Sequence, residues 1–477
     1  MSASPLRRPF VAALMLSSAL ALGACVSVPH LAAAPQIKPV QSYAAQQSLT
    51  APAADWPQDA WWKAYGDDQL GALIDEALAG SPDLAIAEAR VRKAEAYAQQ
   101  AGAARLPALD ANAGVGLTKQ SYNMGFPPAY VPHGWKGEGN GSLDFSYEFD
   151  FWGKNRATFA AATSAADAAL ADAAAARLTL STSVAAAYGD LARLYADRDA
   201  AADAVRVRAQ SQDLISQRQT QGLENQSAVE RARAGRAAAE ADLAAVDESI
   251  GLTRDRIAAL LGQGPDRGLA IQPPPASAIK PFGLPQNLQA ALIGRRPDVV
   301  AARLRAEAAS QKIKAAKAEF YPNVNLNAAI GLQSLGLDTL VKAGSVYGSI
   351  GPALSLPIFS AGRLQGAYRG ARADYDEAVA DYDQTLTHAL QDVADVAVSE
   401  RALDTRLSRS REALDASQNA WRMAQDRYRG GLATYLDVLT AEDALIANRR
   451  AVADLQTRAF SLDIALTRAL GGGFQSA

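Results

Sequence analysis

The sequence of this chain repeats itself, and the repeat limits the folds available to it. Matching segments lie 215 residues apart early in the chain and 209 residues apart later on. The pairs are Ser81-Pro82-Asp83-Leu84 with Arg296-Pro297-Asp298-Val299, Leu106-Pro107 with Tyr321-Pro322, Gly222-Leu223 with Gly431-Leu432, and Leu261-Gly262 with Leu470-Gly471. Such self-similarity predicts one structural unit built twice. We place the first repeat at 61–262 and the second at 286–472, joined by a Pro-rich linker at 263–285.

Each repeat predicts a long, a medium and a short helix. In the first repeat we expect them at 156–221, 223–261 and 83–105, with lengths of about 100, 58 and 35 Å at 1.5 Å per residue. The second repeat has its equivalents at 363–430, 432–470 and 297–320. Because the medium and short helices together nearly match the long one, we expect them to lie end to end beside it.

The segment from Tyr428 to Glu442 predicts the tip of a helical hairpin. Gly430 and Gly431 can adopt the left-handed backbone conformation that ends a helix, and Gly222 is the equivalent position in the first repeat. Beyond the tip, apolar residues recur every seven positions, which indicates a coiled-coil seam: Val438, Leu445, Val452, Ala459 and Leu466. A solid two-stranded stalk would show the same period, so the pattern leaves open whether the helices enclose a tube.

Four segments alternate apolar and polar side chains, as β-strands with two different faces do. We expect strands at about 107–118, 140–151, 322–333 and 346–357, and a flexible loop at the glycine-rich segment 137–141. The alternation fits a soluble antiparallel sheet with one wet face. It also fits a membrane-spanning barrel with a wet lumen.

Four strands are too few to close a membrane barrel, because the smallest ones have about eight. If the strands span a membrane, several copies of the chain must share one barrel. Two copies would supply eight strands around a filled interior, whereas three would supply twelve and leave room for a lumen.

Composition argues against several classes of function. The net charge of −3, from 47 basic and 50 acidic residues, does not favour binding to nucleic acid. Aromatic residues make up only 7% of an alanine-rich chain, which suits thin helix seams better than a thick core. His30, His133 and His388 lie far apart in the sequence, which argues against a multi-histidine metal site, although carboxylates could still bind a cation. We expect no metal site and no cofactor. We also expect no catalytic residues.

The amino end reads as a secretory signal peptide at 1–24. Two arginines precede an apolar run at 10–22, and Leu22-Gly23-Ala24 leads to Cys25, the only cysteine. This stretch resembles the bacterial lipobox, in which the cysteine carries the lipid; the alternative is a buried cysteine in an ordinary signal peptide. We expect 25–60 to be an extended lipidated tether and 473–477 a short tail. Val26 is not the aspartate that retains enteric lipoproteins in the inner membrane, which favours the outer membrane by resemblance.

Several segments together resemble the trimeric outer-membrane efflux channels, the TolC-like or outer membrane factor family, and within it the lipoprotein branch similar to OprM. These segments are Leu22-Gly23-Ala24-Cys25, Trp61-Trp62, Asp67-Asp68-Gln69-Leu70, Arg295-Arg296-Pro297-Asp298, Ala318-Glu319-Phe320-Tyr321-Pro322, Leu356-Pro357-Ile358-Phe359 and 428–438. The resemblance implies a mostly α-helical homotrimer. Its twelve-stranded β-barrel, with four strands per chain, would continue into a long periplasmic α-helical coiled-coil barrel.

The resemblance also implies a function and partners. The expected function is that of an outer-membrane exit duct of a tripartite efflux pump, which passively conducts drugs or other small molecules from the periplasm to the exterior. The expected partners are outer-membrane lipid, a periplasmic adaptor (membrane fusion protein) and an inner-membrane pump, commonly of the resistance-nodulation-division type. Two alternatives stay open: a type I protein-secretion or metal-efflux duct of the same fold, and a non-conducting periplasmic coiled-coil lipoprotein. An enzyme is not expected.

Within this family the hairpin tip resembles the periplasmic entrance, where an acidic ring and hydrogen bonds between helices close the channel. Asp437 matches the first aspartate of the gate, and Tyr428 matches the tyrosine that links neighbouring helices. The gate arginine, the second aspartate and the partner carboxylate of the first repeat fall at Ala433, Thr440 and Ala228. We therefore expect closure to depend on Asp437 and on packing by Leu436 and Leu439. The alternative is that Asp437 is a solvated tip carboxylate.

Overall fold

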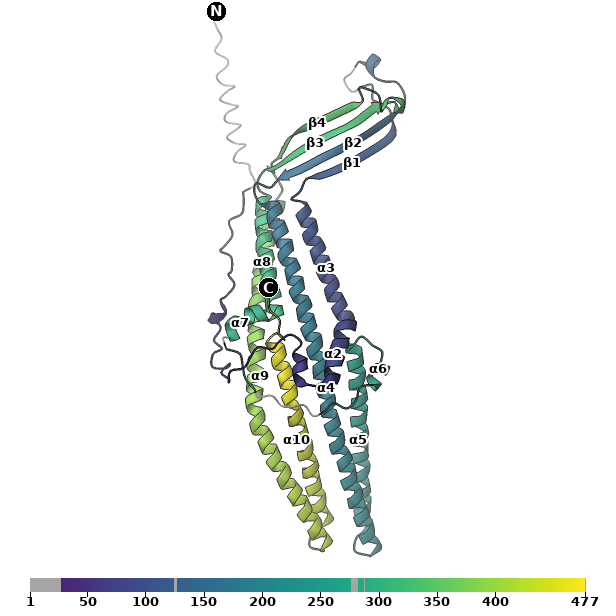
Figure 1. Ribbon diagram of the computed structural model, residues 1–477, viewed down its shortest axis with the longest axis vertical. Coiled ribbons are helices and arrows are strands. Elements are labelled where there is room, and N and C mark those ends of the chain that lie inside the picture. The colour runs from purple at the N-terminus through teal and green to yellow at the C-terminus, as the bar shows by residue number, and fades with distance from the viewer. Residues whose placement is uncertain (1–26, 124–126, 276–281, 287, 477) are drawn as a thin grey trace, which may run out of the picture. The chain divides into compact units, whose positions relative to one another are not determined.

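The structure is a computed structural model that describes residues 27–123, 127–275, 282–286 and 288–476. Its larger elements follow in chain order (Figure 1): α2 Asp68–Gly80, α3 Pro82–Ala103, β1 Ala108–Thr118, β2 Lys136–Phe149, α4 Lys154–Thr220, α5 Gln226–Leu260, α6 Asp266–Leu269, α7 Leu288–Arg295, α8 Pro297–Ala318, β3 Asn323–Leu335, β4 Val346–Ser355, α9 Arg363–Arg429 and α10 Tyr435–Ala469. The predicted lipobox, Leu22 to Cys25, lies outside the described residues.

The chain forms two compact units. The described residues of the first are 27–36, 91–123, 127–168 and 303–381, and those of the second are 37–90, 169–275, 282–286, 288–302 and 382–476. Helices α3, α4, α8 and α9 each run from one unit into the other. The first unit contains the β-sheet, and the second contains the helical hairpins formed by α4 with α5 and by α9 with α10.

The repeat is visible in the bounds of the helices. α4 and α9 have 67 residues each, α5 and α10 have 35 each, and both pairs are offset by 209 positions at their two ends. α3 and α8 have 22 residues each and are offset by 215. Medium and short helices also meet end to end, because Gly262 lies against the carbonyl of Gly80 while Gly471 lies against the carbonyl of Arg295. The predicted doubling is confirmed.

The first unit holds a four-stranded antiparallel sheet in the order β1-β2-β3-β4. Its register places apolar side chains opposite one another, as in the pairs Leu109 with Phe145 and Leu143 with Ile330. Polar side chains occupy the other face, where Asp110 lies opposite Asp144. Large apolar side chains remain exposed on this single chain: Leu109, Val115, Leu117, Leu143, Ile330, Val346, Ile350 and Leu354. β1 and β4 pair on one side only, so both edges of the sheet can accept a further strand.

The second strand begins earlier than we predicted. β2 runs from Lys136 to Phe149 instead of 140–151, so the glycine-rich segment 137–141 is a strand and not a loop. Gly139 pairs with Val115 on one side and with Ser334 on the other, and these ladder bonds outweigh the low strand propensity of glycine. The strand ends before Asp150 because this carboxylate accepts hydrogen bonds from the backbone N–H groups of Asn155 and Arg156 and so starts α4.

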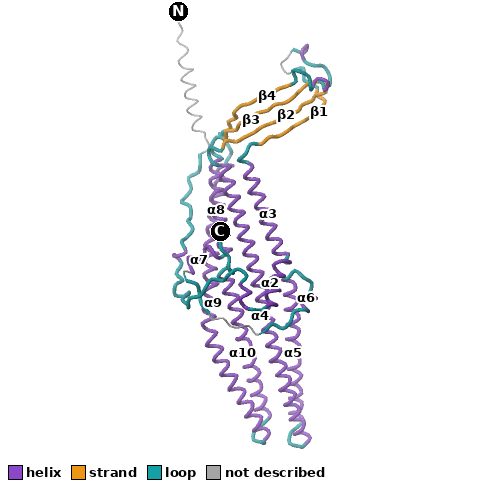
Figure 2. The backbone as a smooth tube through the Cα atoms, viewed as in Figure 1, coloured by secondary structure: helices purple, strands orange, loops and turns teal. Residues whose placement is uncertain are grey.

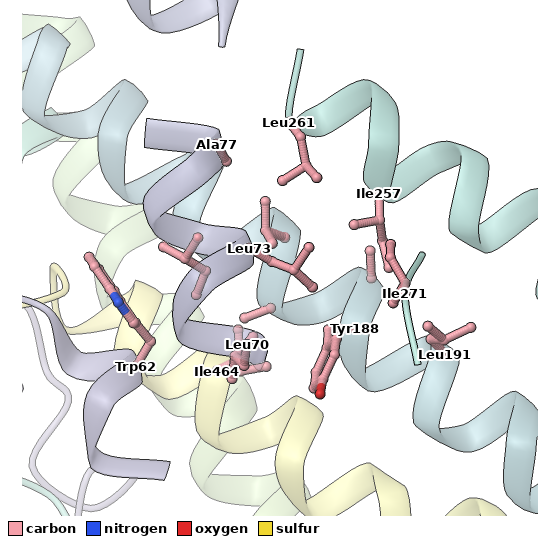
Figure 3. Packing of buried hydrophobic residues seen from close by; sticks show 14 of the residues in the cluster. Trp62, Leu70, Leu73, Ala77, Tyr188, Leu191, Ile257, Leu261, Ile271 and Ile464 are labelled. Carbon is pink, nitrogen blue, oxygen red and sulfur yellow. The ribbon is translucent and has the colours of Figure 1, made fainter. Parts of the chain in front are cut away.

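The thickest core of the second unit lies where α2 packs against α4 and α5 (Figure 3). Leu70, Leu73 and Ile74 of α2 are almost completely buried. Tyr188 of α4 is buried beside them, and its hydroxyl donates to Asp67, 2.8 Å away. Because Asp67 also accepts a hydrogen bond from the backbone N–H of Leu70, the same carboxylate caps α2 and ties it to α4.

The segment 37–60, which we expected to be part of an extended tether, packs against α9. Val40 is 2% exposed and belongs to a cluster with Tyr382 and Leu386 of α9. Arg401 of α9 donates to the carbonyl of Ser48 at 2.7 Å. The linker joins this packing too, since Ala53 forms a parallel bridge with Leu284. The sequence did not predict this packing because the apolar side chains of this Pro- and Ala-rich segment follow no regular period.

Candidate functional site: the paired hairpin tips

Two helical hairpins end in short loops, at residues 221–225 and 430–434 (Figure 2). Gly222 and Gly431 both have a φ of 74°, the left-handed conformation that glycine adopts without a steric penalty. The N–H of Leu223 donates to the carbonyl of Arg218 at 2.9 Å, and that of Leu432 donates to the carbonyl of Arg427 at 2.8 Å. Gly430 does not adopt the left-handed conformation. The two tips therefore share one Schellman-type turn.

Asp437 lies in the first turn of α10 and is exposed. Its carboxylate accepts hydrogen bonds from the backbone N–H and from the hydroxyl of Thr434, both at 2.8 Å. These two bonds hold the pKa of Asp437 below its usual range. Within one chain, Asp437 thus caps α10. Leu436 beside it is 68% exposed, whereas Leu439 packs partly against the apolar cluster described next.

The tip cluster joins the two hairpins. Its buried members are Ile215, Ala228, Ala232, Tyr428, Tyr435 and Val438, from α4, α5, α9 and α10. Tyr428 is 1% exposed, and its hydroxyl donates to Glu224 of the other tip at 2.9 Å. The guanidinium of Arg218 lies 4.6 Å from the centre of the Tyr428 ring and donates to the Tyr428 carbonyl at 3.2 Å. Burial and the Glu224 carboxylate raise the pKa of Tyr428, so it remains a neutral donor.

A second set of contacts was missed by the sequence reasoning. Glu442 of α10 is 0% exposed and accepts hydrogen bonds from Arg208 at 2.8 Å, from the hydroxyl of Ser211, and from Trp421 at 3.4 Å. Arg208, 8% exposed, also donates to Asp443. We call these five residues the Glu442 network. Glu442 lies four residues after Val438 and three before Leu445, so it occupies a seam position; an acid in phase with the heptad was the available signal.

The centre of the Glu442 network is a buried ion pair between Arg208 of α4 and Glu442 of α10. Burial raises the pKa of Glu442, while the hydrogen bond from Ser211 and the charge of Arg208 oppose that shift. Burial and the nearby Glu442 raise the pKa of Tyr435 to about 12. Two more ion pairs extend the same seam, from Asp203 to Arg449 at 3.2 Å and from Arg193 to Asp454 at 3.7 Å.

The structure brings the predicted tip residues of the second repeat close to those of the first. In the part of the chain that the structure describes, no three His, Cys, Asp or Glu side chains form a group that could hold a metal ion. Among the same residues, no α-helix combines the length and the apolar character needed to cross a membrane.

Comparisons with known proteins agree with this architecture. The family model described as outer membrane efflux protein matches residues 73–263 and 288–472. The crystal structure of the outer membrane protein VceC from Vibrio cholerae superposes with a TM-score of 0.84 at 47% identity, covering 88% of this chain and 100% of that one.

Curated relatives point to the same family. The multidrug resistance outer membrane protein MdtP of Escherichia coli O6:H1 is 32% identical over 94% of this chain and 93% of its own length. The fusaric acid resistance protein FusA of Burkholderia cepacia is 36% identical over 78% of this chain and 71% of its own. The predicted fold class and outer-membrane location are confirmed, and the chain belongs to the outer membrane efflux protein family.

Proposed function

We propose that three copies of this chain form one channel, which serves as the outer-membrane exit duct of a tripartite efflux pump. The observation that carries this proposal is the sheet with one apolar face and two unpaired edges. A four-stranded sheet that exposes Val115, Ile350 and Leu354 is unfavourable in water because its apolar face is uncovered. Its unpaired edges also need hydrogen-bonding partners. Three sheets joined edge to edge give a twelve-stranded barrel with lipid outside and a wet lumen.

The partners follow from the same role. A periplasmic adaptor and an inner-membrane pump of the resistance-nodulation-division type would supply substrate and energy, because a passive duct does neither. The named relatives MdtP and FusA are resistance proteins, which favours drugs or other small molecules as cargo. A protein-secretion or metal-efflux duct of the same fold is the alternative. Lipid on Cys25 would add an anchor to the membrane.

Conductance in planar lipid bilayers tests the proposal. The purified full-length protein should migrate as a trimer in native mass measurements and should produce discrete single-channel steps. A trimer without conductance would instead support the non-conducting structural lipoprotein. Co-purification with the pump encoded beside its gene would then distinguish a drug pump from a secretion or metal exporter.

We also propose that Asp437, Tyr428, Leu436 and Leu439 close the periplasmic entrance. Three copies of the exposed Asp437 around one axis would repel one another and would attract cations. Asp437→Ala should raise the single-channel conductance and weaken the preference for cations. Asp437→Asn is the matched control, because it keeps an oxygen that can cap α10 while removing the charge. If both variants behave as wild type, the aspartate only caps its helix.

A further inference from the structure

A cavity of about 680 Å³ lies in the second unit, between α4 and α10. Its lining comes from these two helices, from the linker residues 273–275, from Tyr65 just before α2 and from Arg411 of α9. Every one of these residues belongs to the second unit of a single chain. Pockets of about 300–1,000 Å³ are the size that holds a drug-sized molecule, so this cavity is large enough to be a binding site.

Part of the lining is apolar and flat. Phe460 is 9% exposed and lies directly on Gly189, where an added Cβ would come within 2.8 Å of the ring. The Tyr65 ring meets the Phe460 ring edge to face, with centroids 5.0 Å apart. Alanines of both helices complete this surface: Ala192, Ala196, Ala453 and Ala459. Small side chains beside aromatic rings leave room for a flat apolar body.

The linker supplies a rigid wall. The side-chain amide of Gln69 donates to the carbonyl of Gln272 at 3.1 Å and accepts from its backbone N–H at 2.9 Å. Arg254 holds the preceding residue, because its guanidinium donates to the carbonyl of Ile271 at 2.8 Å. The prolines at 273–275 follow immediately and have a fixed φ. A wall that is already ordered reduces the entropy lost when a molecule binds against it.

Four charged side chains line the cavity, and two of them have partners. Asp463 accepts a hydrogen bond from a tyrosine hydroxyl, and Arg198 pairs with Asp247 at 2.7 Å. In the described part of the chain, Asp199 and Arg411 take part in no hydrogen bond and no ion pair. Both are exposed. The cavity therefore offers one acid and one base that a bound molecule can pair with.

We propose that this cavity binds a drug-sized zwitterion, in which an apolar body separates an ammonium group from a carboxylate. The ammonium group pairs with Asp199, the carboxylate pairs with Arg411, and the body lies on Phe460 beside the prolines. A molecule with one charge would satisfy only one of the two side chains. The site lies within one copy of the chain, so it does not rest on the proposed trimer.

Isothermal titration calorimetry of the purified full-length protein tests the site with three matched probes. The zwitterion is biphenyl with an aminomethyl group at one end and a carboxylate at the other; biphenylcarboxylic acid lacks the amine, and biphenylmethylamine lacks the carboxylate. The zwitterion should bind once per chain. Each singly charged probe should bind roughly fivefold more weakly, because one exposed ion pair is lost. No saturable binding of the zwitterion, or equal affinity for all three probes, would overturn the proposal.

Neutral variants show whether the two named side chains make the contacts. Asp199→Asn should weaken binding of the zwitterion roughly fivefold and leave that of the acid probe unchanged. Arg411→Gln should weaken binding of the zwitterion equally and leave that of the amine probe unchanged. Asp213→Asn and Arg422→Gln are the matched controls, because they change exposed residues of the same two helices outside the cavity lining. Equal affinity in all four variants would place the bound molecule elsewhere and contradict the proposal.

Reversing one charge gives a test that a structural role would not pass. Arg411→Asp puts two acids in the cavity, so the amine probe should bind better than the acid probe. Asp199→Arg puts two bases there and should reverse that preference. Preferences that do not reverse between the two variants would sink the proposal. Planar bilayers are measured in parallel: absence of conductance in the wild type would contradict the proposed duct alone, since binding needs only one folded chain.

Discussion

The two hairpin tips have the same backbone and different side chains. Their turns match in φ and in hydrogen bonding, and their helices match in length. Yet Tyr428 corresponds to Gln219, and Asp437 corresponds to Ala228, a buried member of the tip cluster. Only the second tip therefore has an acid at the predicted gate position, and its tyrosine reaches across to Glu224 of the first. The two repeats therefore share the backbone conformation of the tip but not its polar side chains.

Among the variants that test this difference between the repeats, removing the counter-charge of Glu442 should cause the largest loss of stability. Arg208→Met leaves a carboxylate that is 0% exposed without its partner, which should cost about 3–5 kcal/mol of unfolding free energy. Urea denaturation followed by tryptophan fluorescence would measure the loss, since Trp421 contacts the network.

Two further variants show whether the loss is electrostatic. Arg233→Met changes the exposed repeat counterpart of Glu442 and should shift stability by less than about 0.5 kcal/mol. Arg208→Met with Glu442→Met replaces the pair by apolar side chains and should recover most of the loss. An Arg208→Met variant as stable as Arg233→Met would show that the ion pair holds nothing together.

The tip glycines should behave alike in the two repeats. Gly222→Ala and Gly431→Ala force alanine into the left-handed conformation at a φ of 74°, at about 1–2 kcal/mol each. Gly430→Ala is the matched control, because Gly430 has no positive φ and its added Cβ would meet only ordinary contacts. Thermal unfolding would measure all three. Unequal costs at Gly222 and Gly431 would mean that the backbone equivalence does not extend to energetics.

The hydrogen bond from Tyr428 to Glu224 should matter less. Tyr428→Phe keeps the buried ring under Arg218 and removes only the hydroxyl, so about 1 kcal/mol should be lost. A double-mutant cycle with Glu224→Ala isolates the pair. The two losses should be non-additive; fully additive losses would indicate that the hydroxyl and the carboxylate do not interact in solution.

Sequence reasoning reached most of the fold because its strongest signals are local. Prolines, tip glycines and the period of seven placed the hairpins, and the offsets of the repeat placed their equivalents. The predicted start of β2 was wrong because Gly139 belongs to the strand through its pairing with Val115, a long-range contact that local sequence does not show. The Glu442 network was missed for the same reason: the place of Glu442 in the heptad was visible in the sequence, but its partner Arg208 is 234 residues away. Whether Asp437 closes the entrance stays a prediction, since it depends on neighbouring copies.

A last contrast between the repeats lies farther up the long helices. Leu191 of α4 is 0% exposed in the main core, and its counterpart in α9 is Glu400, which is half-buried. Burial, then the charges of Asp463 and Asp404, raise the pKa of Glu400 to about 7, and Arg458 partly opposes them. The folded state therefore holds the proton of Glu400 more tightly than the unfolded chain does.

The direction of the pH dependence follows from that difference. The pKa of Glu400 is higher in the folded state than in the unfolded chain. Its contribution to stability is therefore complete below a pH of about 4.5, the unfolded pKa, and is lost as the pH rises to about 7. Wild type should thus lose thermal stability between pH 4.5 and pH 7 by more than Glu400→Gln does, with the smallest effect of the set because solvent screens a half-buried group. If the melting temperatures of the two proteins fell by the same amount across this pH range, Glu400 would have an ordinary pKa. The contrast with Leu191 would then be one of shape alone.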